Sequence, residues 1–356
     1  MRTRHRLLLS LSFLVATSLV LCSCRGPQRF AQDNRWSIAT KPEKLGYNSA
    51  KLAEARAYAA GINTAAVVVV VDGQILCEWG DVNQKFNTHS IRKSFLSALY
   101  GRYVRDGVID LDLTLAEAGI DDNPPLTEKE KAATIRDCLK ARSAVYHPAL
   151  YESAVMKQRR PARYTMQAGT HWYYNNWDFN ALGTIFEEYT GKKVFEAIEE
   201  EIARPIGMED FSATDGTYVT GDDSIHPAYP FRITARDLAR FGLLMLNEGQ
   251  WNGREIIPRD WVRESTRYHS DAALYGADGY GYMWWVVRDH NKFPHLPGVT
   301  LPEGSYSARG AGGHYLLVIP ERDMVIVHRV NTDIRGNRVS KAEFGTLAQM
   351  ILSAAD

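Results

Sequence analysis

Hydrophobic runs near the two ends of the chain have the length and composition of β-strands. Residues 65–71 are a continuous run of alanine and valine, and the Asp72-Gly73 pair that follows is typical of a hairpin turn. Residues 74–79 have the pattern of the returning strand. Four more short strand-like runs lie near the C-terminus, at residues 282–288, 306–309, 315–319 and 324–329. This pattern predicts an antiparallel sheet built from both ends of the chain.

The middle of the chain carries apolar residues at helical spacing. The spacing predicts helices at residues 90–105, 178–189, 194–202 and 234–247, and two more at 49–60 and 340–354. We therefore predict an α+β fold, in which an antiparallel sheet is flanked by helices and a mostly helical region is inserted. The sheet part spans about residues 46–88 and 281–356, and the insertion about 89–280.

A polar and irregular stretch at residues 144–170 interrupts the helical pattern. Loops of this length are uncommon, and they often cover a functional site. His147 lies in this stretch. We expect this histidine to pack the loop rather than to contact a substrate.

The first 24 residues have the pattern of a signal peptide. Three arginines precede the apolar run 7–21, which is too short and wrongly flanked for a transmembrane helix. A small residue before Cys24 resembles a bacterial lipoprotein signal. We expect export to the periplasm or cell envelope, with Cys24 as a lipidated membrane tether; plain secretion is the alternative. Residues 25–45 form a linker.

The composition is that of a globular protein and points away from polyanionic partners. Lys+Arg and Asp+Glu are both 42 among 356 residues, so we expect no nucleic-acid binding. Cys77 and Cys138 follow the predicted signal peptide, and we expect two free thiols because buried free cysteines are common. Neither belongs to a cluster with metal-ligand spacing, and we predict no metal or cofactor.

Ser90 and Lys93 stand three residues apart at the predicted start of the helix 90–105. Positions i and i+3 lie on the same helix face, so the hydroxyl and the amine can meet. A serine needs a neighbouring base to become a nucleophile, and a lysine can serve when its surroundings lower its pKa. S-x-x-K is a short pattern, and it indicates an acyl-transfer site only together with other groups.

An aromatic and amide-rich stretch at residues 170–177 directly precedes the next helix. It contains the pattern Y-x-N twice, as Tyr173 with Asn175 and as Tyr174 with Asn176. We choose Tyr174 and Asn176, because the helix then starts at the expected offset. A phenol can act as general base once positive neighbours lower its pKa, and an asparagine can bind substrate and hold the lysine.

A glycine-rich segment at residues 307–313 follows one of the late strands. Three glycines in four positions let the backbone approach a ligand closely. A backbone N–H of this strand, together with that of Ser90, would form an oxyanion hole. The substrate-binding and oxyanion candidates of this segment are Arg309, Gly310 and Ala311.

The order of these parts resembles the serine β-lactamase and penicillin-binding protein superfamily. It is most similar to the class C-like hydrolases of the nylon-oligomer (6-aminohexanoate) branch, from about residue 65 to the C-terminus. Further supporting strings lie at residues 134–143, 202–208, 235–239 and 251–253. The resemblance implies a β-lactamase/transpeptidase-like fold with Ser90 as the acylated nucleophile. It implies that Lys93 accepts the serine proton or keeps Tyr174 ionised. It further implies that Tyr174 relays protons and that Asn176 positions substrate and Lys93.

The chain departs from this family at one motif. Where relatives carry K-T-G or H-x-G, it has Ala308-Arg309-Gly310. The lysine or histidine of the relatives helps to bind a substrate carboxylate, so its loss lowers our expectation of β-lactamase activity. Arg309 replaces the charge if its side chain faces the cleft, and strand alternation gives an equal chance that it faces solvent.

We therefore predict an exported serine hydrolase that cleaves a small-molecule amide or ester through an acyl-enzyme on Ser90. One alternative is a β-lactamase or D-Ala-D-Ala peptidase. An alternative of another class is a non-catalytic, acyl-binding or peptidoglycan-sensing lipoprotein.

Overall fold

The computed structural model describes residues 35–273, 279–288 and 295–355. The predicted signal peptide with Cys24 and much of the predicted linker lie outside these residues. Among the helices of the described ranges, none is both long and apolar enough to cross a membrane.

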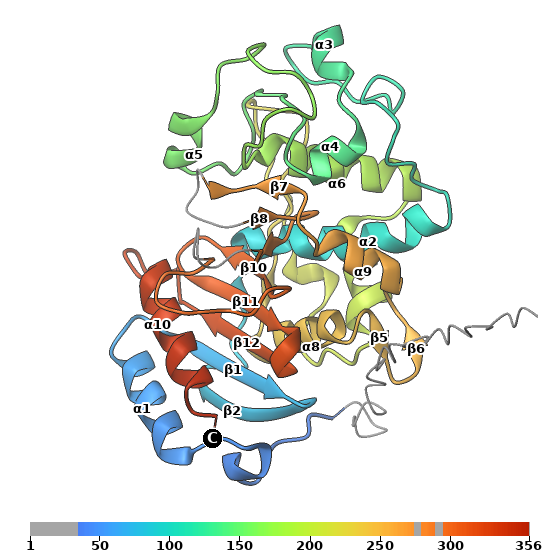
Figure 1. The fold of residues 1–356 in the computed structure, drawn as a ribbon. Coiled ribbons are helices and arrows are strands. Elements are labelled where there is room, and N and C mark those ends of the chain that lie inside the picture. Colours follow the sequence, from blue (N-terminus) through green and yellow to red (C-terminus); the bar gives the residue numbers. More distant parts are fainter. Residues whose placement is uncertain (1–34, 274–278, 289–294, 356) are drawn as a thin grey trace, which may run out of the picture.

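An eight-stranded antiparallel sheet forms the frame of the molecule (Figure 1). Its strand order is β2-β1-β12-β11-β10-β9-β8-β7. The strands are β1 (Ala66–Val71), β2 (Gln74–Gly80), β7 (Ser270–Asp271), β8 (Gly279–Tyr280), β9 (Trp285–Val286), β10 (Tyr306–Gly310), β11 (His314–Ile319) and β12 (Met324–Arg329).

The sheet joins the two ends of the chain, as the hydrophobic runs predicted. β1 pairs with β12, with Val68 opposite Val327. The β1–β2 hairpin turns at Asp72 and Gly73, whose φ angles of 47° and 70° are those of the left-handed region that such turns need. The short strands β7 and β8 come from the range that we assigned to the helical insertion. Two residues are too few to show an alternating pattern, so these strands were not predictable from hydrophobic periodicity.

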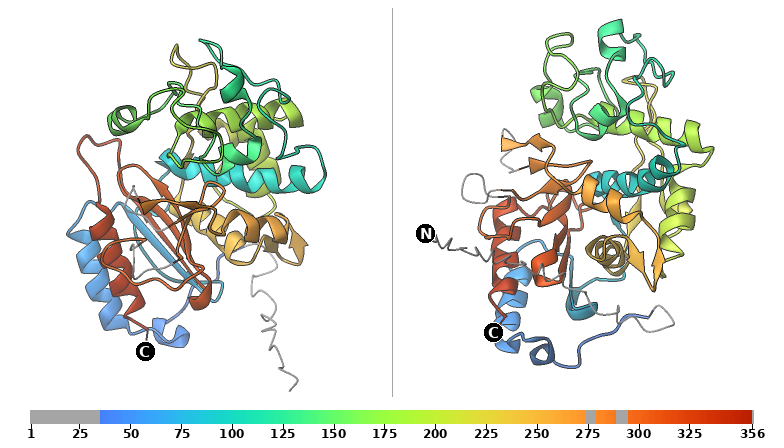
Figure 2. Two further views of the ribbon diagram at one scale, coloured as in Figure 1. Left: turned by 45° about the horizontal axis from the view of Figure 1, so that its top comes forward. Right: turned by 45° about the vertical axis from the view of Figure 1, so that its right-hand side comes forward.

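Helices cover both faces of the sheet (Figure 2). α1 (Ser49–Ala60) and α10 (Lys341–Leu352) pack side by side on one face, over one set of alternating strand residues that includes Val67 and Leu317. α8 (Ala235–Leu246) covers the opposite face, over the set that includes Val68 and Leu316. Thr234 caps α8, since its side chain accepts a hydrogen bond from the Asp237 N–H.

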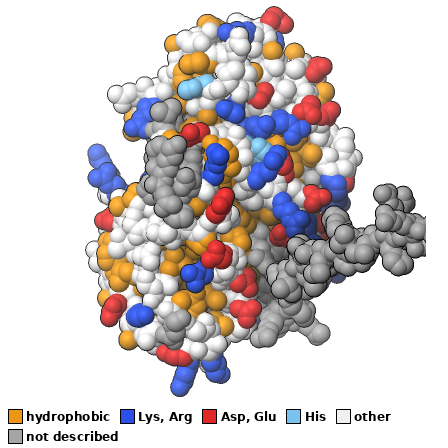
Figure 3. Space-filling view, viewed as in Figure 1, with side chains coloured by type: hydrophobic (Ala, Val, Ile, Leu, Met, Phe, Trp, Pro, Cys, Tyr) orange, Lys and Arg blue, Asp and Glu red, His pale blue; other side chains and the backbone are white. Residues whose placement is uncertain are grey.

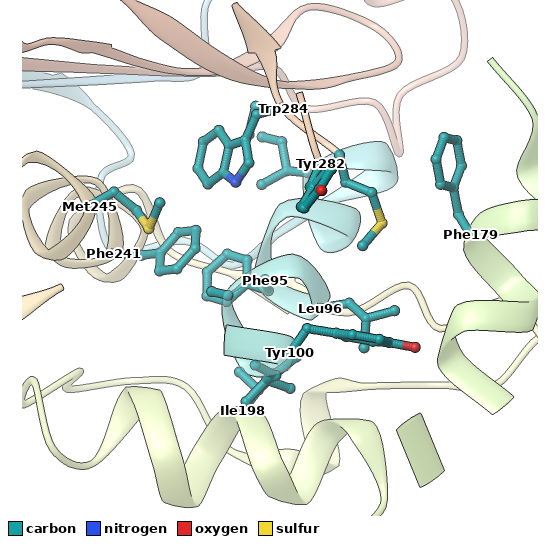
Figure 4. Close-up of a cluster of buried hydrophobic side chains, with 14 of the residues drawn as sticks. Phe95, Leu96, Tyr100, Phe179, Ile198, Phe241, Met245, Tyr282 and Trp284 are labelled. Atoms are coloured by element: carbon teal, nitrogen blue, oxygen red, sulfur yellow. The ribbon is translucent and has the colours of Figure 1, made fainter. Parts of the chain in front are cut away.

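α2 (Arg92–Arg105) runs through the middle of the molecule, between the sheet and the helical region. Phe95 stacks on Phe241 of α8 with ring centroids 3.8 Å apart (Figure 4). Leu96 and Tyr100 lie in the same buried cluster. A single 3-10 turn, η2 (His89–Ile91), leads into α2 and carries Ser90. The helix that bears the S-x-x-K pair is therefore held on several sides by apolar side chains.

The remaining elements are short apart from α6, and most belong to the helical region. The helices are α3 (Glu128–Lys131), α4 (Ile135–Leu139), α5 (Ala154–Arg159), α6 (Asn176–Thr190), α7 (Val194–Ala197) and α9 (Arg259–Ser265). Two small ladders pair β3 (Phe86–Asn87) with β4 (Arg232–Ile233) and β5 (Gln250–Trp251) with β6 (Arg254–Glu255). Single turns are η1 (Pro42–Leu45), η4 (Ala213–Asp215) and η6 (Pro320–Arg322), and a π-helical segment, η3 (Ile198–Ala203), continues α7.

Candidate active site

Ser90 and Lys93 meet as the S-x-x-K spacing predicted. Ser90 lies in η2, and Lys93 is the second residue of α2. The Lys93 Nζ atom is 3.0 Å from the Ser90 Oγ atom. Lys93 is only 1% exposed, whereas Ser90 is partly accessible. The nucleophile candidate is thus open to a ligand, and its partner amine is not.

Tyr174 and Asn176 complete the surroundings of the amine. The Tyr174 hydroxyl and the Asn176 Oδ1 atom each lie 2.7 Å from Lys93 Nζ. The alternative pair points elsewhere: the Tyr173 hydroxyl donates to the Met156 carbonyl, and Asn175 caps α6. The choice of Tyr174 with Asn176 therefore agrees with the geometry.

Two features of its surroundings favour a neutral Lys93 amine. Burial lowers its pKa well below the ordinary value, and the guanidinium of Arg92 lowers it further. Aromatic faces of Tyr174 and Phe179 lie 4.2 and 4.6 Å from Nζ, and such contacts favour a cation by about 0.5–2 kcal/mol. Burying a charge costs several kcal/mol, so burial outweighs them.

Arg92 is an unusual neighbour for this amine. It is fully buried, and its Nη2 group donates to the Asn180 Oδ1 atom at 3.0 Å. Its Nε and Nη1 groups find no hydrogen-bond acceptor in the described part of the chain, and its Cζ lies 4.2 Å from the Tyr229 ring centroid. No carboxylate among the described residues is hydrogen-bonded to it, and its charge lowers the pKa of Lys93, whereas the Glu152 carboxylate acts in the opposite direction.

The pKa of Tyr174 departs from what the sequence suggested. We expected positive neighbours to lower it. Burial instead raises the pKa of Tyr174 to about 12, although a hydrogen bond with Ser90 and the charges of Arg92 and Arg309 act in the opposite direction. Loss of water around a buried phenolate outweighs two cations that do not contact it directly. Of the two roles that we considered for Lys93, the direct proton acceptor fits this electrostatic setting, and the support of an ionised Tyr174 does not.

A neutral amine matches its three polar neighbours in hydrogen-bonding capacity. It has one lone pair and two N–H groups. The Asn176 Oδ1 atom only accepts, and Tyr174 accepts the second N–H. The lone pair then remains for the Ser90 O–H, the proton of which must leave when the serine attacks.

The sequence did not single out Tyr151, which holds Asn176 in orientation. The Asn176 Nδ2 group donates to the Tyr151 carbonyl oxygen at 2.8 Å, so Oδ1 must face Lys93. The Tyr151 hydroxyl contacts Asn87 Nδ2 at 3.1 Å and His89 Nδ1 at 3.4 Å. Tyr151 belongs to the stretch 144–170, which therefore does pack against the site as predicted.

The glycine-rich strand closes the other side of Ser90. β9 pairs with Tyr306 and Ser307 of β10 but not with the residues that follow. A Cβ atom at Gly310 would lie 2.7 Å from the Thr88 carbonyl oxygen and 3.3 Å from the His89 Cβ atom. Only glycine permits this approach of the strand to the nucleophile turn. Ala311 follows Gly310 in the chain and belongs to the turn between β10 and β11.

Arg309 does not face solvent. It is 8% exposed, and its Cζ lies 4.8 Å from the centroid of the Trp285 ring, which stacks on Tyr174. Its Nε group donates to Ser307 Oγ and its Nη2 group to the His295 carbonyl, while the buried Nη1 group has no partner within the described ranges. Burial lowers the pKa of Arg309 to about 10.

The histidine and the two cysteines that the sequence analysis considered have structural roles. His147 is buried and contacts the carbonyl oxygens of Pro148 and Pro124, so it packs the loop as expected. Cys77 and Cys138 are free cysteines, as predicted. Across the described ranges, no three His, Cys, Asp or Glu side chains gather as metal ligands would.

With this geometry established, comparison with known proteins identifies the family. The model of the β-lactamase family matches residues 50–349. The chain belongs to the β-lactamase family. An uncharacterised protein of Alkalihalophilus pseudofirmus is 21% identical over 295 residues, which cover 75% of this chain and 84% of the relative. This confirms the resemblance to the serine β-lactamase and penicillin-binding protein superfamily.

Solved structures share the fold at low sequence identity. A 6-aminohexanoate-dimer hydrolase homologue from Bacillus anthracis aligns with a TM-score of 0.63 and 22% identity, over 90% of this chain and 87% of the other. A penicillin-binding protein homologue from Caulobacter crescentus gives 0.62 and 15%, over 89% and 99%. EstCE1, a hydrolase with promiscuous acyltransferase activity, gives 0.62 and 13%, over 88% and 99%. The predicted β-lactamase/transpeptidase-like fold is confirmed.

Proposed function

We propose that this protein is a serine hydrolase that cleaves an amide or ester through an acyl-enzyme on Ser90. The contact of the buried Lys93 amine, the pKa of which burial lowers, with the Ser90 hydroxyl is the observation that supports it most. Ser90 Oγ attacks the substrate carbonyl carbon while its proton passes to Lys93 Nζ. The carbonyl oxygen becomes an oxyanion, which the N–H groups of Ser90 and Ala311 stabilise.

Collapse of this intermediate breaks the bond to the leaving group. The proton on Lys93 passes through the Tyr174 hydroxyl, 2.7 Å away, to the leaving nitrogen or oxygen. Water then attacks the carbonyl carbon of the acyl-enzyme and gives a proton to Lys93 through the Tyr174 hydroxyl. The bond to Ser90 Oγ breaks, Lys93 returns the proton to Ser90, and the acid product leaves. Tyr174 stays neutral between turnovers, in keeping with its raised pKa.

The surroundings of Arg309 favour substrates with a negative group beside the scissile bond. Among the residues that the structure describes, its Nη1 group has no hydrogen-bond acceptor, and its guanidinium packs on Trp285, which stacks on Tyr174. A carboxylate bound there would receive the missing hydrogen bond. A linear amide or ester that carries a carboxylate fits this description. The substrates of the β-lactamase or D-Ala-D-Ala peptidase alternative fit it as well.

We further propose that the protein is exported and held at the cell envelope through Cys24. The arginines and apolar run of residues 1–24 support this proposal. Metabolic labelling with a fatty-acid analogue should label the wild type and not Cys24→Ala; equal labelling of both would contradict the tether.

Ser90 labelling is the central test. A fluorophosphonate probe, which loses fluoride as Ser90 Oγ bonds to phosphorus, should label the wild type and not Ser90→Ala. Mass spectrometry of the labelled peptide identifies the residue. Equal labelling of both proteins would contradict the assignment.

A substrate panel separates the alternatives. Short esters, linear amides, D-amino-acid peptides and β-lactams, each with and without a carboxylate, are compared by turnover. Hydrolysis of nitrocefin as fast as the best ester would favour the β-lactamase alternative. A single stoichiometric acylation without release would favour the sensing lipoprotein.

A further inference from the structure

Arg329 is a buried arginine at the end of β12 that the catalytic steps do not use. It has no exposed surface. Its Nη2 group donates to the carbonyl oxygens of Phe86 and Asn87 at 2.9 and 3.0 Å, and Nη1 donates to the Ile233 carbonyl at 3.3 Å. Phe86 and Asn87 form β3, which ends three residues before Ser90. Arg329 therefore holds the segment from which the nucleophile turn begins.

The same guanidinium also holds the glycine-rich strand. Its Nε group donates to His314 Nδ1 at 3.0 Å. His314 begins β11 and lies directly opposite Gly310 in the strand register. One planar group thus connects both backbone segments that would supply the oxyanion hole. A lysine has a single nitrogen and cannot make this set of contacts.

The contact with Arg329 also fixes the proton of His314. An arginine only donates, so His314 Nδ1 must accept, and the ring proton lies on Nε2. Burial and the Arg329 charge lower the pKa of His314 well below its ordinary value, which keeps the ring neutral. The Thr332 Oγ1 atom lies 3.5 Å from His314 Nε2 and 2.8 Å from His89 Nε2. The contacts that start at Arg329 thus reach the residue before Ser90.

His89 shows why the turn needs such support. Its φ angle of 46° lies in the left-handed region, which is costly for a residue with a Cβ atom. A conformation of this kind persists where surrounding contacts hold it. Thr332 and Tyr151 contact the two ring nitrogens of His89.

We propose that Arg329 is a positioning residue for acyl transfer, which sets the spacing between the Ser90 turn and the Gly310 strand and so aligns the oxyanion hole. This inference rests on the acyl-enzyme function proposed above. Arg329 touches no reacting atom, and it acts through Phe86, Asn87 and His314.

Arg240 provides a matched control. It is also fully buried, and it binds Glu209 and the Ile206 carbonyl from α8, where no catalytic candidate lies. Arg329→Lys and Arg240→Lys are compared on a p-nitrophenyl ester and in the rate of fluorophosphonate labelling. Both should lower the melting temperature. Only Arg329→Lys should lower kcat and the labelling rate, by about 10- to 100-fold with KM little changed, because misaligned catalytic groups cost rates of this order.

A second pair of variants covers the case in which Arg329→Lys does not fold. An Asn at position 314 offers an acceptor where His314 has Nδ1, and a Leu does not. His314→Asn should retain at least about tenfold more kcat than His314→Leu at equal thermal stability. A ¹⁵N spectrum of the wild type should show His314 protonated on Nε2 only.

The outcomes are distinct. If Arg329→Lys folds and labels as fast as Arg240→Lys, or if His314→Asn and His314→Leu have the same kcat, Arg329 has no positioning role. If the wild type itself is not labelled at Ser90, the proposed function fails, and the comparison of variants is not reached.

Discussion

The Lys93 amine is hydrogen-bonded to three oxygen atoms, none of which carries a charge. Ser90, Tyr174 and Asn176 all offer neutral groups, and burial lowers the pKa of the amine. A carboxylate in place of any of them would stabilise the ammonium form and remove the base. This explains why the group that contacts Lys93 is an amide oxygen, that of Asn176, the orientation of which Tyr151 fixes.

The pH dependence of acylation tests this assignment. Only the neutral amine accepts a proton, and its fraction grows as pH rises through the Lys93 pKa. The labelling rate should therefore rise along a limb well below pH 10.5, the ordinary lysine value, and level off above it. A limb near pH 12 would instead assign the base to Tyr174. Lys93→Arg keeps the cation but cannot accept a proton, and it should lose at least about 10²-fold at every pH.

Arg92→Met sharpens the same prediction. Removal of the neighbouring guanidinium raises the Lys93 pKa, so the limb should move to higher pH while the plateau rate changes less. A limb at the wild-type position, in a folded variant, would show that Arg92 does not tune the amine. The pH profile of fluorophosphonate labelling measures both proteins.

At the scale of elements, the candidate site lies where η2 meets the end of β10 that pairs with β11 but not with β9. Gly310 permits this close approach, because a Cβ atom there would lie 2.7 Å from the Thr88 carbonyl oxygen. The strand itself was predictable from its hydrophobic run, and the glycines from their known freedom. The distance between turn and strand was not predictable, because it depends on contacts between residues more than 200 positions apart, such as Arg329 with Phe86.

Gly310→Ala tests the approach. Its Cβ atom would meet the Thr88 carbonyl, a backbone group that cannot rotate away, so strand and turn must separate. We expect kcat to fall by about 10²-fold or more, the loss expected when an oxyanion-hole donor is removed, with KM less affected. Steady-state ester hydrolysis measures both.

Gly242→Ala is the control for this change. A Cβ there meets Leu316 and Val325 side chains between α8 and the sheet, at a similar distance. It should cost stability and leave kcat per labelled site unchanged. Equal losses of kcat in the two variants would mean that Gly310 has only a packing role.

At the scale of the whole molecule, the two sheet faces have different tasks. The face under α1 and α10 is an apolar core formed by both ends of the chain, while α2 with its catalytic candidates lies on the opposite side (Figure 2). The hydrophobic pattern predicted a sheet built from both ends of the chain and flanked by helices, but not which helices cover which face. It could not reveal Arg329 or Tyr151, because an arginine at a strand end or a tyrosine in a loop is an ordinary surface residue until the fold surrounds it.

Leu347→Ala tests the division. Leu347 is fully buried in α10, and its truncation should lower the free energy of unfolding by about 2–5 kcal/mol. Urea denaturation measures this loss. The kcat per fluorophosphonate-labelled site should stay at the wild-type value; a large decrease would show that the far face is coupled to the site.

The charge of the molecule is unevenly distributed. The formal net charge is zero, and acidic and basic side chains are mixed over the surface in Figure 3. Inside, Arg92, Arg309 and Arg329 surround the site, and no carboxylate among the described residues is bonded to any of them. Burial of three arginines without a hydrogen-bonded carboxylate makes the interior around Ser90 electropositive. Under the proposed function, an anionic substrate group or the oxyanion would weaken the repulsion among these cations.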